Sequence, residues 1–209
     1  EVKDAIDVLA GRTQGDLLEI SLLLGSHMLV LAEKAKTLPE ARTMLENALS
    51  SGAGLRKLAE MIAAQGGDPR VVEDLSLLPQ AAVKRVMRAE TAGYLSAMDT
   101  TALGMAAQRM GAGRAKKSDM LDYSVGYVLH VRLGDEVTED TPLATLYARN
   151  EAEAEEAEKA IRKALTIARK KPQAPKLWDA VVTAEGIIYN REEKRINTRK
   201  GHESEVHSI

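Results

Sequence analysis

The chain has 209 residues, which is enough for one large or two small domains with a buried core. Its formal net charge is -2, so the charge balance gives no indication of a nucleic-acid partner. Cysteine is absent, which excludes disulfides, thiolate metal sites and cysteine catalysis. The sequence shows no apolar run of membrane-spanning length and no opening secretory signal, so we expect a soluble, cytoplasmic protein without a membrane partner.

The apolar residues favour helices in the first part of the chain. Hydrophobic residues make up 44% of the sequence while aromatic residues make up only 3%, so the core has to be built from aliphatic side chains and methionine. Alanine, leucine and methionine are strong helix formers. Apolar residues at helical spacing predict four helices, at residues 1–9, 16–35, 38–50 and 54–65.

Three details refine this helical region. The second helix is apolar nearly all round, which predicts that it is buried, and His27 within it fits a hydrogen-bonded core histidine better than a ligand. Thr37 and Glu40 form a capping-box pattern ahead of the third helix. The first helix begins at Glu1 without a cap, so we expect a truncated sequence in which a longer segment precedes Glu1.

A second region, with a β-β-α-β-β order, follows from about residue 80. Residues 82–88 and 93–98 alternate as strands do, and Asp99 is placed to cap a helix that ends at Gly111. Residues 126–147 read as two strands joined by a turn, a hairpin that looks like half of a lipoyl- or biotinyl-type domain.

Charges are ordered along residues 150–171. Acidic residues come first and basic residues last, which complements the helix dipole, and glutamates lie four residues before Lys159 and Arg162. We therefore expect one helix up to Pro172 with a thin apolar stripe: Ala157, Ile161, Ala164, Leu165 and Ala168. A docked turn is expected near residues 177–182, and the polar residues 191–209 are expected to be disordered.

The best local candidate for binding chemistry is the segment Gly111-Ala-Gly-Arg-Ala-Lys-Lys. Its candidate residues are Gly111, Gly113, Arg114, Lys116 and Lys117. Glycines leave backbone N–H groups accessible and three cations follow, so the loop suits a phosphate group. It lacks the G-x-x-x-x-G-K-[ST] pattern of a Walker loop. A basic turn that only joins a helix to a strand explains the same residues.

Other polar residues give weaker indications. Asp119 and Asp122 are spaced to pair as carboxylates, although Asp119 also suits an ordinary turn. His130 is expected on the solvated face of a strand, and His202 and His207 lack metal-ligand spacing. The Gly-x-Ser-x-Gly elbow is also missing, and no motif indicates a Ser-His-Asp arrangement.

Several motifs resemble one enzyme family. The motifs G-Y-L-S-A-M-D, G-A-G-R-A-K-K-S-D-M-L-D-Y-S-V-G and G-D-E-V, from residue 93 to residue 137, resemble the C-terminal domain of pyrimidine-nucleoside phosphorylases, a group that includes thymidine phosphorylase. The resemblance continues upstream through E-V-K-D-A-I-D, L-G-S-H-M, L-A-E-K-A and A-A-Q-G-G-D. It covers about three-quarters of the chain, in the right order.

The resemblance implies a pentosyltransferase that converts a pyrimidine nucleoside and phosphate into the base and a pentose 1-phosphate. It implies inorganic phosphate as co-substrate, no required cofactor, and a homodimer formed through an N-terminal region that this sequence lacks. The family's K-x-S-T-G-G-type phosphate loop is not found here, so the resemblance assigns no catalytic residue to this sequence, and we expect the segment alone to be inactive. The resemblance also implies that the loop from Gly111 to Lys117 faces the catalytic cleft, either as a lid or as an element that supports the residues in contact with the substrate.

The resemblance also implies a structural monovalent or calcium-like cation. Family members hold it with backbone carbonyls and the second acidic residue of an E-V-K-E-A-I motif, and Asp4 takes that place here. Aspartate is one methylene shorter than glutamate, and a solvent-facing helical aspartate explains Asp4 equally well.

The resulting expectation is an α+β segment of an α/β enzyme in four parts. They are a helical layer of the catalytic domain, a β-rich C-terminal subdomain, a C-terminal helical extension and a tail: residues 1–79, 80–149, 150–190 and 191–209. The alternatives are a stand-alone interaction module without catalysis and the C-terminal part of a nucleotide (AMP-type) phosphorylase. A lipoyl- or biotinyl-carrier domain fits poorly, because Lys116 and Lys117 do not lie at the hairpin tip.

Overall fold

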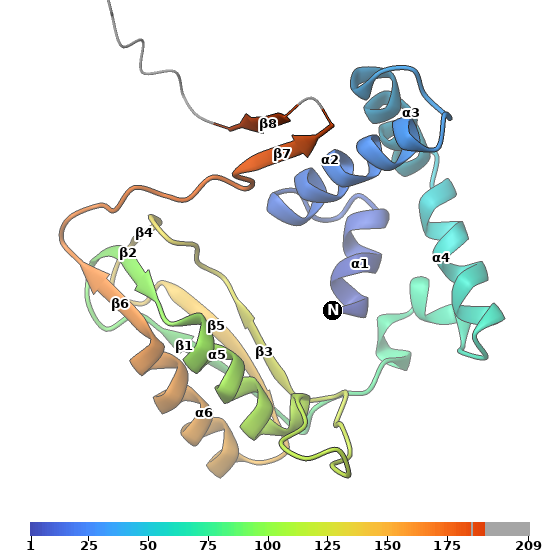
Figure 1. Cartoon of the computed structure of the whole chain (residues 1–209). Coiled ribbons are helices and arrows are strands. Elements are labelled where there is room, and N and C mark those ends of the chain that lie inside the picture. Colours follow the sequence, from blue (N-terminus) through green and yellow to red (C-terminus); the bar gives the residue numbers. More distant parts are fainter. Residues whose placement is uncertain (185, 191–209) are drawn as a thin grey trace, which may run out of the picture. The chain divides into compact units, whose positions relative to one another are not determined.

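A computed structural model describes residues 1–184 and 186–190. The chain divides into two compact units, one up to Pro175 and one from Lys176 onward (Figure 1). The first unit contains a helical segment followed by a β-rich segment with two helices, so the predicted mixture of helix and sheet is confirmed. None of the described helices is both long enough and apolar enough to cross a membrane.

The four helices predicted in the first segment are all present. They are α1 (Val2–Leu9), α2 (Asp16–Leu31), α3 (Leu38–Ser50) and α4 (Ala53–Ala64). Two short 3-10 turns, Pro69–Val72 and Leu75–Leu77, lead from α4 to the first strand. The Thr37 hydroxyl accepts a hydrogen bond from the backbone N–H of Glu40, and the Glu40 carboxylate accepts one from the N–H of Lys36, so the capping pattern is confirmed.

The expectation that α2 is buried on all sides is wrong for the described residues. Its buried residues lie on one face, where Leu18 and Leu22 pack with Val8 of α1. On the other face Leu24, Met28 and Leu31 are 57%, 68% and 84% exposed. The reason is that α1 and α3 cover only one side of α2, because the helical segment forms two small apolar clusters rather than one large core.

The β-rich segment contains two three-stranded sheets (Figure 1). The first has the order β1-β5-β3 and is antiparallel, with strands Val83–Arg88, Pro142–Ala148 and Gly126–Leu129. The second has the order β4-β2-β6, with strands Glu136–Val137, Gly93–Met98 and Leu165–Ala168. The helices α5 (Thr100–Ala107) and α6 (Glu151–Ala164) pack against each other beside these sheets.

The expected hairpin is correct in its strand pairing but wrong in its connection. Strands β3 and β5 pair from Gly126 opposite Tyr147 to Leu129 opposite Ala144. Between them the chain crosses to the other sheet, where β4 pairs with β2. The turn at Gly134 therefore passes the chain between two sheets, and the likeness to half of a lipoyl-type domain is not confirmed.

The helix expected up to Pro172 ends earlier, at Ala164. Residues 165–168 form β6, which pairs with β2 from Leu165 opposite Met98 to Ala168 opposite Tyr94. The Ala164 carbonyl accepts a hydrogen bond from the N–H of Asp99 at 2.8 Å. The edge of β2 offers this segment backbone partners, and its β-branched residues Thr166 and Ile167 favour a strand.

Helix α6 belongs to the core of the β-rich segment, whereas the sequence placed it in a separate extension from residue 150. Its buried side chains share one cluster with Met87 of β1, Leu95 of β2 and Leu146 of β5. Those buried side chains of α6 are Ala154, Ala157, Ile161 and Ala164. The small alanines let the helix approach the sheet residues closely, so residues 151–168 pack with the subdomain that precedes them.

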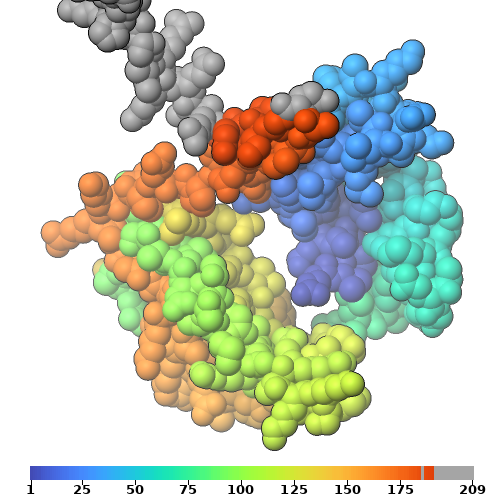
Figure 2. Space-filling view, viewed as in Figure 1, coloured from blue at the N-terminus to red at the C-terminus, as the bar shows by residue number. Residues whose placement is uncertain are grey.

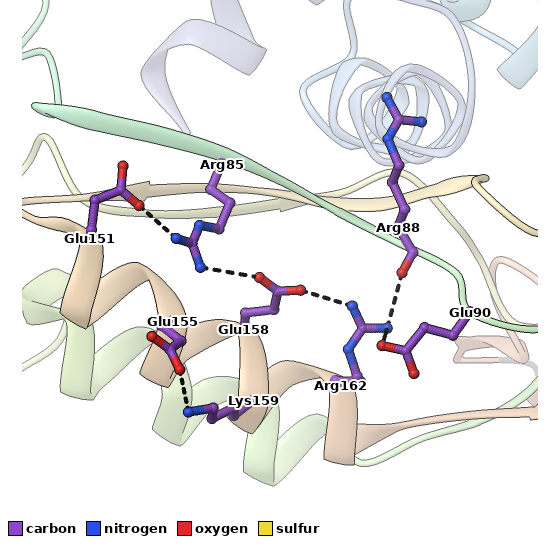
Figure 3. Close-up of polar contacts among 8 residues, drawn as sticks. All are labelled: Arg85, Arg88, Glu90, Glu151, Glu155, Glu158, Lys159 and Arg162. Atoms are coloured by element: carbon purple, nitrogen blue, oxygen red, sulfur yellow. Dashed lines mark hydrogen bonds and ion pairs between the residues drawn. The ribbon is translucent and has the colours of Figure 1, made fainter.

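A chain of polar contacts joins β1 to α6 (Figure 3). It runs through Arg85, Arg88, Glu90, Glu151, Glu158 and Arg162. The Glu158 carboxylate lies 3.5 Å from the Arg85 guanidinium on β1 and 2.8 Å from that of Arg162, one helical turn further along α6. The predicted pairs of Glu155 with Lys159 and of Glu158 with Arg162 are therefore confirmed.

The second unit contains a two-stranded hairpin where a docked turn was expected. Strands β7 (Ala180–Thr183) and β8 (Gly186–Tyr189) pair antiparallel, with Val181 opposite Ile188. The expected turn near residues 177–182 is wrong, because the valine and isoleucine residues there favour extended backbone. The tail expected to be disordered, residues 191–209, lies outside the described residues.

Replacing Ile161 with alanine tests whether α6 is part of the core. Ile161 is fully buried, so we expect the free energy of unfolding to fall by about 2–5 kcal/mol. Lys163→Ala, on the exposed side of the same helix, should change it by less than about 0.5 kcal/mol. Urea unfolding followed by circular dichroism measures both. Equal, small effects would mean that α6 does not pack into this core.

Two glutamates of α6 allow a matched test of the contacts in Figure 3. The Glu158 side chain is 25% exposed and contacts arginines of two elements, whereas the Glu155 side chain is 57% exposed and pairs only within its own helix. Because both positions are helical, replacement by alanine changes helix propensity equally. We expect Glu158→Ala to lower the urea midpoint at least about twice as much as Glu155→Ala, and the reverse order would contradict the assigned link to β1.

Candidate functional site

The candidate loop begins at the end of α5, which is firmly anchored. The Asp99 carboxylate caps the helix by accepting a hydrogen bond from the N–H of Ala102 at 2.9 Å, as predicted. Leu103, Ala106 and Met110 point into the main core of the segment. The Tyr127 hydroxyl of β3 donates a hydrogen bond to the Leu103 carbonyl at 2.7 Å, and burial raises the pKa of this hydroxyl.

Helix α5 ends in a π turn at residues 108–112. Gly111 lies in this turn with φ of 102°, a conformation that side chains with a Cβ rarely adopt. Its carbonyl accepts a hydrogen bond from the N–H of Asp122 at 3.0 Å. Gly111 therefore ends the helix, as the sequence predicts, and its backbone joins the two ends of the loop. Single π turns occur frequently at functional sites.

Two side chains hold the backbone of residues 114–116. The Gln108 side-chain amide donates a hydrogen bond to the Arg114 carbonyl at 2.5 Å. One carboxylate oxygen of Asp119 accepts hydrogen bonds from the N–H groups of Ala115 and Lys116, at 3.0 and 2.8 Å. A Cβ at Gly113 would lie 3.1 Å from the Gln108 Cα, so a larger residue there would press against α5.

A second aspartate shapes the far end of the loop. The Asp122 carboxylate accepts hydrogen bonds from the hydroxyl and the N–H of Ser124, at 2.6 and 3.0 Å. These bonds, together with the charge of Arg149, lower the pKa of the Asp122 carboxyl. Asp119 and Asp122 thus stabilise two separate turns, so the acid–acid pair that the sequence allowed is not what these carboxylates form.

The cations of the loop have no acidic partner among the described residues. Arg114, Lys116 and Lys117 are exposed and take part in no ion pair within that part of the chain. Figure 2 shows their segment, coloured yellow-green, as a projecting surface that continues from the green α5. Three uncompensated positive charges on one projecting loop attract an anion.

The loop also carries two exposed apolar side chains. Met120 is 90% exposed and Tyr123 is 78% exposed, although the turns of Asp119 and Asp122 hold the backbone around them. The loop therefore offers charge and apolar surface together on a backbone whose shape is set by local hydrogen bonds.

Asp4, the cation ligand that the resemblance implies, belongs to no cluster of ligating side chains among the described residues. It lies on α1 with its side chain half exposed, and its carboxylate is 3.2 Å from the amino group of Glu1. Within the described residues there is no group of three or more histidine, aspartate or glutamate side chains that would hold a metal ion. The residues at hand therefore do not make a cation site by themselves, and Asp4 would need ligands from elsewhere.

The two histidines among the described residues, His27 and His130, do not meet in one site. His130 Nε2 lies 2.7 Å from the hydroxyl of the buried Thr145, and the side chain is exposed as expected. His27 is half-buried on α2 and lies on a different segment from His130. His202 and His207 fall outside the described residues.

Two of the hollows in the described part of the chain lie between helices. One, of about 650 Å³, lies among the apolar side chains of α1, α2 and α3, including Val8, Leu22 and Leu45. The other, of about 440 Å³, lies between α5 and α6 and is lined by charged residues of both signs, among them Arg109, Glu156 and Lys163. Neither contains a histidine, and only the second adjoins the start of the loop.

Sequence reasoning found the glycines and cations of the loop but missed Gln108. Nothing in its position marks it, because the contact with Arg114 depends on the π turn that carries the chain back over α5. For Asp119 the sequence left two alternatives, a pair with Asp122 or an ordinary turn, and the structure shows the turn. The signal for this turn was the position of Asp119 directly after a Gly-rich basic segment, because aspartate side chains in turns accept hydrogen bonds from nearby backbone N–H groups.

Comparisons with known proteins identify the family. Residues 94–168 match the pyrimidine nucleoside phosphorylase C-terminal domain. The chain is 47% identical over 151 residues to the pyrimidine-nucleoside phosphorylases of Bacillus subtilis (strain 168) and Geobacillus stearothermophilus, covering 72% of this chain and 35% of each relative. It is 40% identical over 168 residues to that of Staphylococcus aureus (strain N315), covering 80% of this chain and 39% of the relative. The chain thus matches just over a third of the length of these relatives, and the family resemblance is confirmed.

Replacing two glycines of the same stretch, Gly111 and Gly104, with alanine should change the free energy of unfolding in opposite directions. At Gly111 an added Cβ meets no atom closer than 3.6 Å, so the cost comes from its φ of 102°, and we expect a loss of about 1–2 kcal/mol in unfolding free energy. Gly104 lies inside α5 with open space around it, so Gly104→Ala should stabilise by about 0.5–1 kcal/mol. Denaturant unfolding of both variants tests this, and stabilisation by Gly111→Ala would contradict the left-handed turn.

Proposed function

We propose that this chain, which carries the C-terminal domain of the pyrimidine-nucleoside phosphorylase family, supplies the C-terminal part of an enzyme that cleaves pyrimidine nucleosides with phosphate. In that reaction phosphate attacks C1′ of the ribose or deoxyribose, the base leaves, and a pentose 1-phosphate forms. The observation that carries the proposal is the 47% identity over 151 residues to two enzymes of that name. The matched region includes α5, the basic loop and β6.

The chemistry itself would be performed by residues outside this sequence. The transition state of such a reaction has oxocarbenium character and a departing base, and both phosphate and base need electrostatic stabilisation from positioned groups. A K-x-S-T-G-G motif is absent from these 209 residues. This chain would therefore supply the helical layer of the catalytic domain, the β-rich subdomain and the basic loop. On its own it would show no phosphorolytic activity.

In the complete enzyme the basic loop would face the cleft in which phosphate binds. The support is electrostatic, because Arg114, Lys116 and Lys117 are exposed and unpaired among the described residues, on a backbone fixed by Gln108 and Asp119. Charged groups that are held in place before the substrate arrives stabilise an anion without the cost of rearrangement. By the same resemblance, the enzyme would be a cytoplasmic homodimer that needs phosphate and no organic cofactor.

A chimera tests this proposal. The segment of the Bacillus subtilis relative that matches this chain would be replaced by the corresponding residues of this chain, and base release from uridine and thymidine would be measured with and without phosphate. We expect phosphate-dependent release by the chimera and none by the 209-residue chain alone. The unmodified relative is the positive control.

Two outcomes would count against the proposal. A folded chimera that releases no base, under conditions in which the relative does, would mean that this chain does not serve as the C-terminal part of such an enzyme. Release of adenine from AMP in preference to base from uridine would favour a nucleotide phosphorylase. Activity of the isolated chain would contradict the assignment of the catalytic groups to residues outside it.

A further inference from the structure

Two side chains, those of Gln108 and Asp119, hold the backbone of the basic loop through hydrogen bonds. We infer that Gln108 and Asp119 are positioning residues, which hold Arg114, Lys116 and Lys117 in the arrangement that receives a phosphate group. The inference rests on the proposed function of the loop, and it assigns a role to two residues that do not themselves contact the anion.

Gln108 fixes the start of the basic segment to the protein core. It lies in the π turn two residues before Met110, whose side chain is buried in the main cluster. Its amide donates to the Arg114 carbonyl, and Gly113 passes so close to Gln108 that a Cβ would lie 3.1–3.3 Å from its atoms. The backbone at Arg114 is therefore held against α5, while the Arg114 side chain stays exposed.

Asp119 fixes the middle of the segment and leaves the cations free. Its Oδ2 accepts the N–H groups of two consecutive residues, Ala115 and Lys116, and its own N–H donates to the Lys116 carbonyl at 3.0 Å. The carboxylate forms no ion pair with Lys116 or Lys117 in the described chain. An acid that bonds to the backbone of its basic neighbours sets their positions without neutralising their side chains.

The charge of Asp119 makes the inference sharply testable. A carboxylate close to an anion site repels phosphate, so removing the charge alone would tighten binding. Removing the hydrogen bonds would loosen the segment, and phosphate would then have to order it on binding, which weakens affinity. The positioning role and a purely electrostatic role therefore predict opposite signs for Asp119→Ala. Asparagine removes the charge and keeps a side-chain oxygen that accepts hydrogen bonds.

The experiment is a titration of the ¹⁵N-labelled 209-residue chain with inorganic phosphate at constant ionic strength, followed by the amide signals of Gly113, Ala115 and Lys116. For the natural sequence we expect saturable shifts confined to the loop. Gln108→Ala, which changes no charge, and Asp119→Ala should each raise the dissociation constant by about fivefold or more. Asp119→Asn should bind at least as tightly as the natural sequence.

Asp122→Asn is the matched control, because it removes the same charge from the other turn of the same loop and leaves residues 114–116 held. Its affinity should stay within about twofold of the natural sequence. The amide signals of Ile161 and Leu146 in the core report that each variant is folded.

The outcomes separate the two ideas. If the natural chain shows no saturable shift in the loop, the phosphate-facing role in the proposed function fails, and the inference with it. If the natural chain binds phosphate while Gln108→Ala binds equally well, or both Asp119 variants bind more tightly, the loop role stands and the positioning role is wrong. Weaker binding by Gln108→Ala and Asp119→Ala, with Asp119→Asn retained, supports the inference.

Discussion

The packing of the apolar stripe of α6 is the constraint on which the β-rich segment depends. Ile161 is fully buried, and Ala157 and Ala164 lie one turn before and one turn after it on the buried face of α6. Together they pack the helix against residues of both sheets. The Glu158 carboxylate then links the helix to Arg85 at one edge of the first sheet. Helix α6 ends at Ala164, beside the start of α5. Residues 165–168 therefore lie along the open edge of β2, where they form the third strand of the second sheet.

The position of the basic loop follows from this packing. Helix α5 lies against α6 and buries Leu103, Ala106 and Met110 in the shared core. Its last turn is therefore rigid where the loop begins, and the π turn with Gly111 directs the chain back over Gln108. Hydrogen bonds from two side chains then fix residues 114–116. The shape of the loop is set by hydrogen bonds to its backbone. Ion pairs between acidic side chains and the loop cations are therefore not needed to hold it in place.

Local patterns predicted local structure well in this chain. The strand at residues 93–98, the caps at Thr37 and Asp99, and the stop at Gly111 follow from short-range rules and are confirmed. Most of the errors involve long-range partners. Residues 165–168 have helix-compatible spacing, but the edge of β2 recruits them as a strand. The connection between β3 and β5 crosses to the other sheet, and the contact of Gln108 with Arg114 depends on a π turn; neither is encoded by spacing.

The distribution of charge separates the paired cations of α6 from the cations of the loop, which pair with no acid among the described residues. On α6, Lys159 and Arg162 each pair with a glutamate one turn earlier, and Arg162 also contacts the Arg88 carbonyl of β1. These pairs neutralise the positive charges of Lys159 and Arg162, so the two side chains attract an external anion only weakly. In the loop, the nearest acid bonds to the backbone instead, which keeps three positive charges available. Holding them apart from acids, on a fixed backbone, is what a site for phosphate requires.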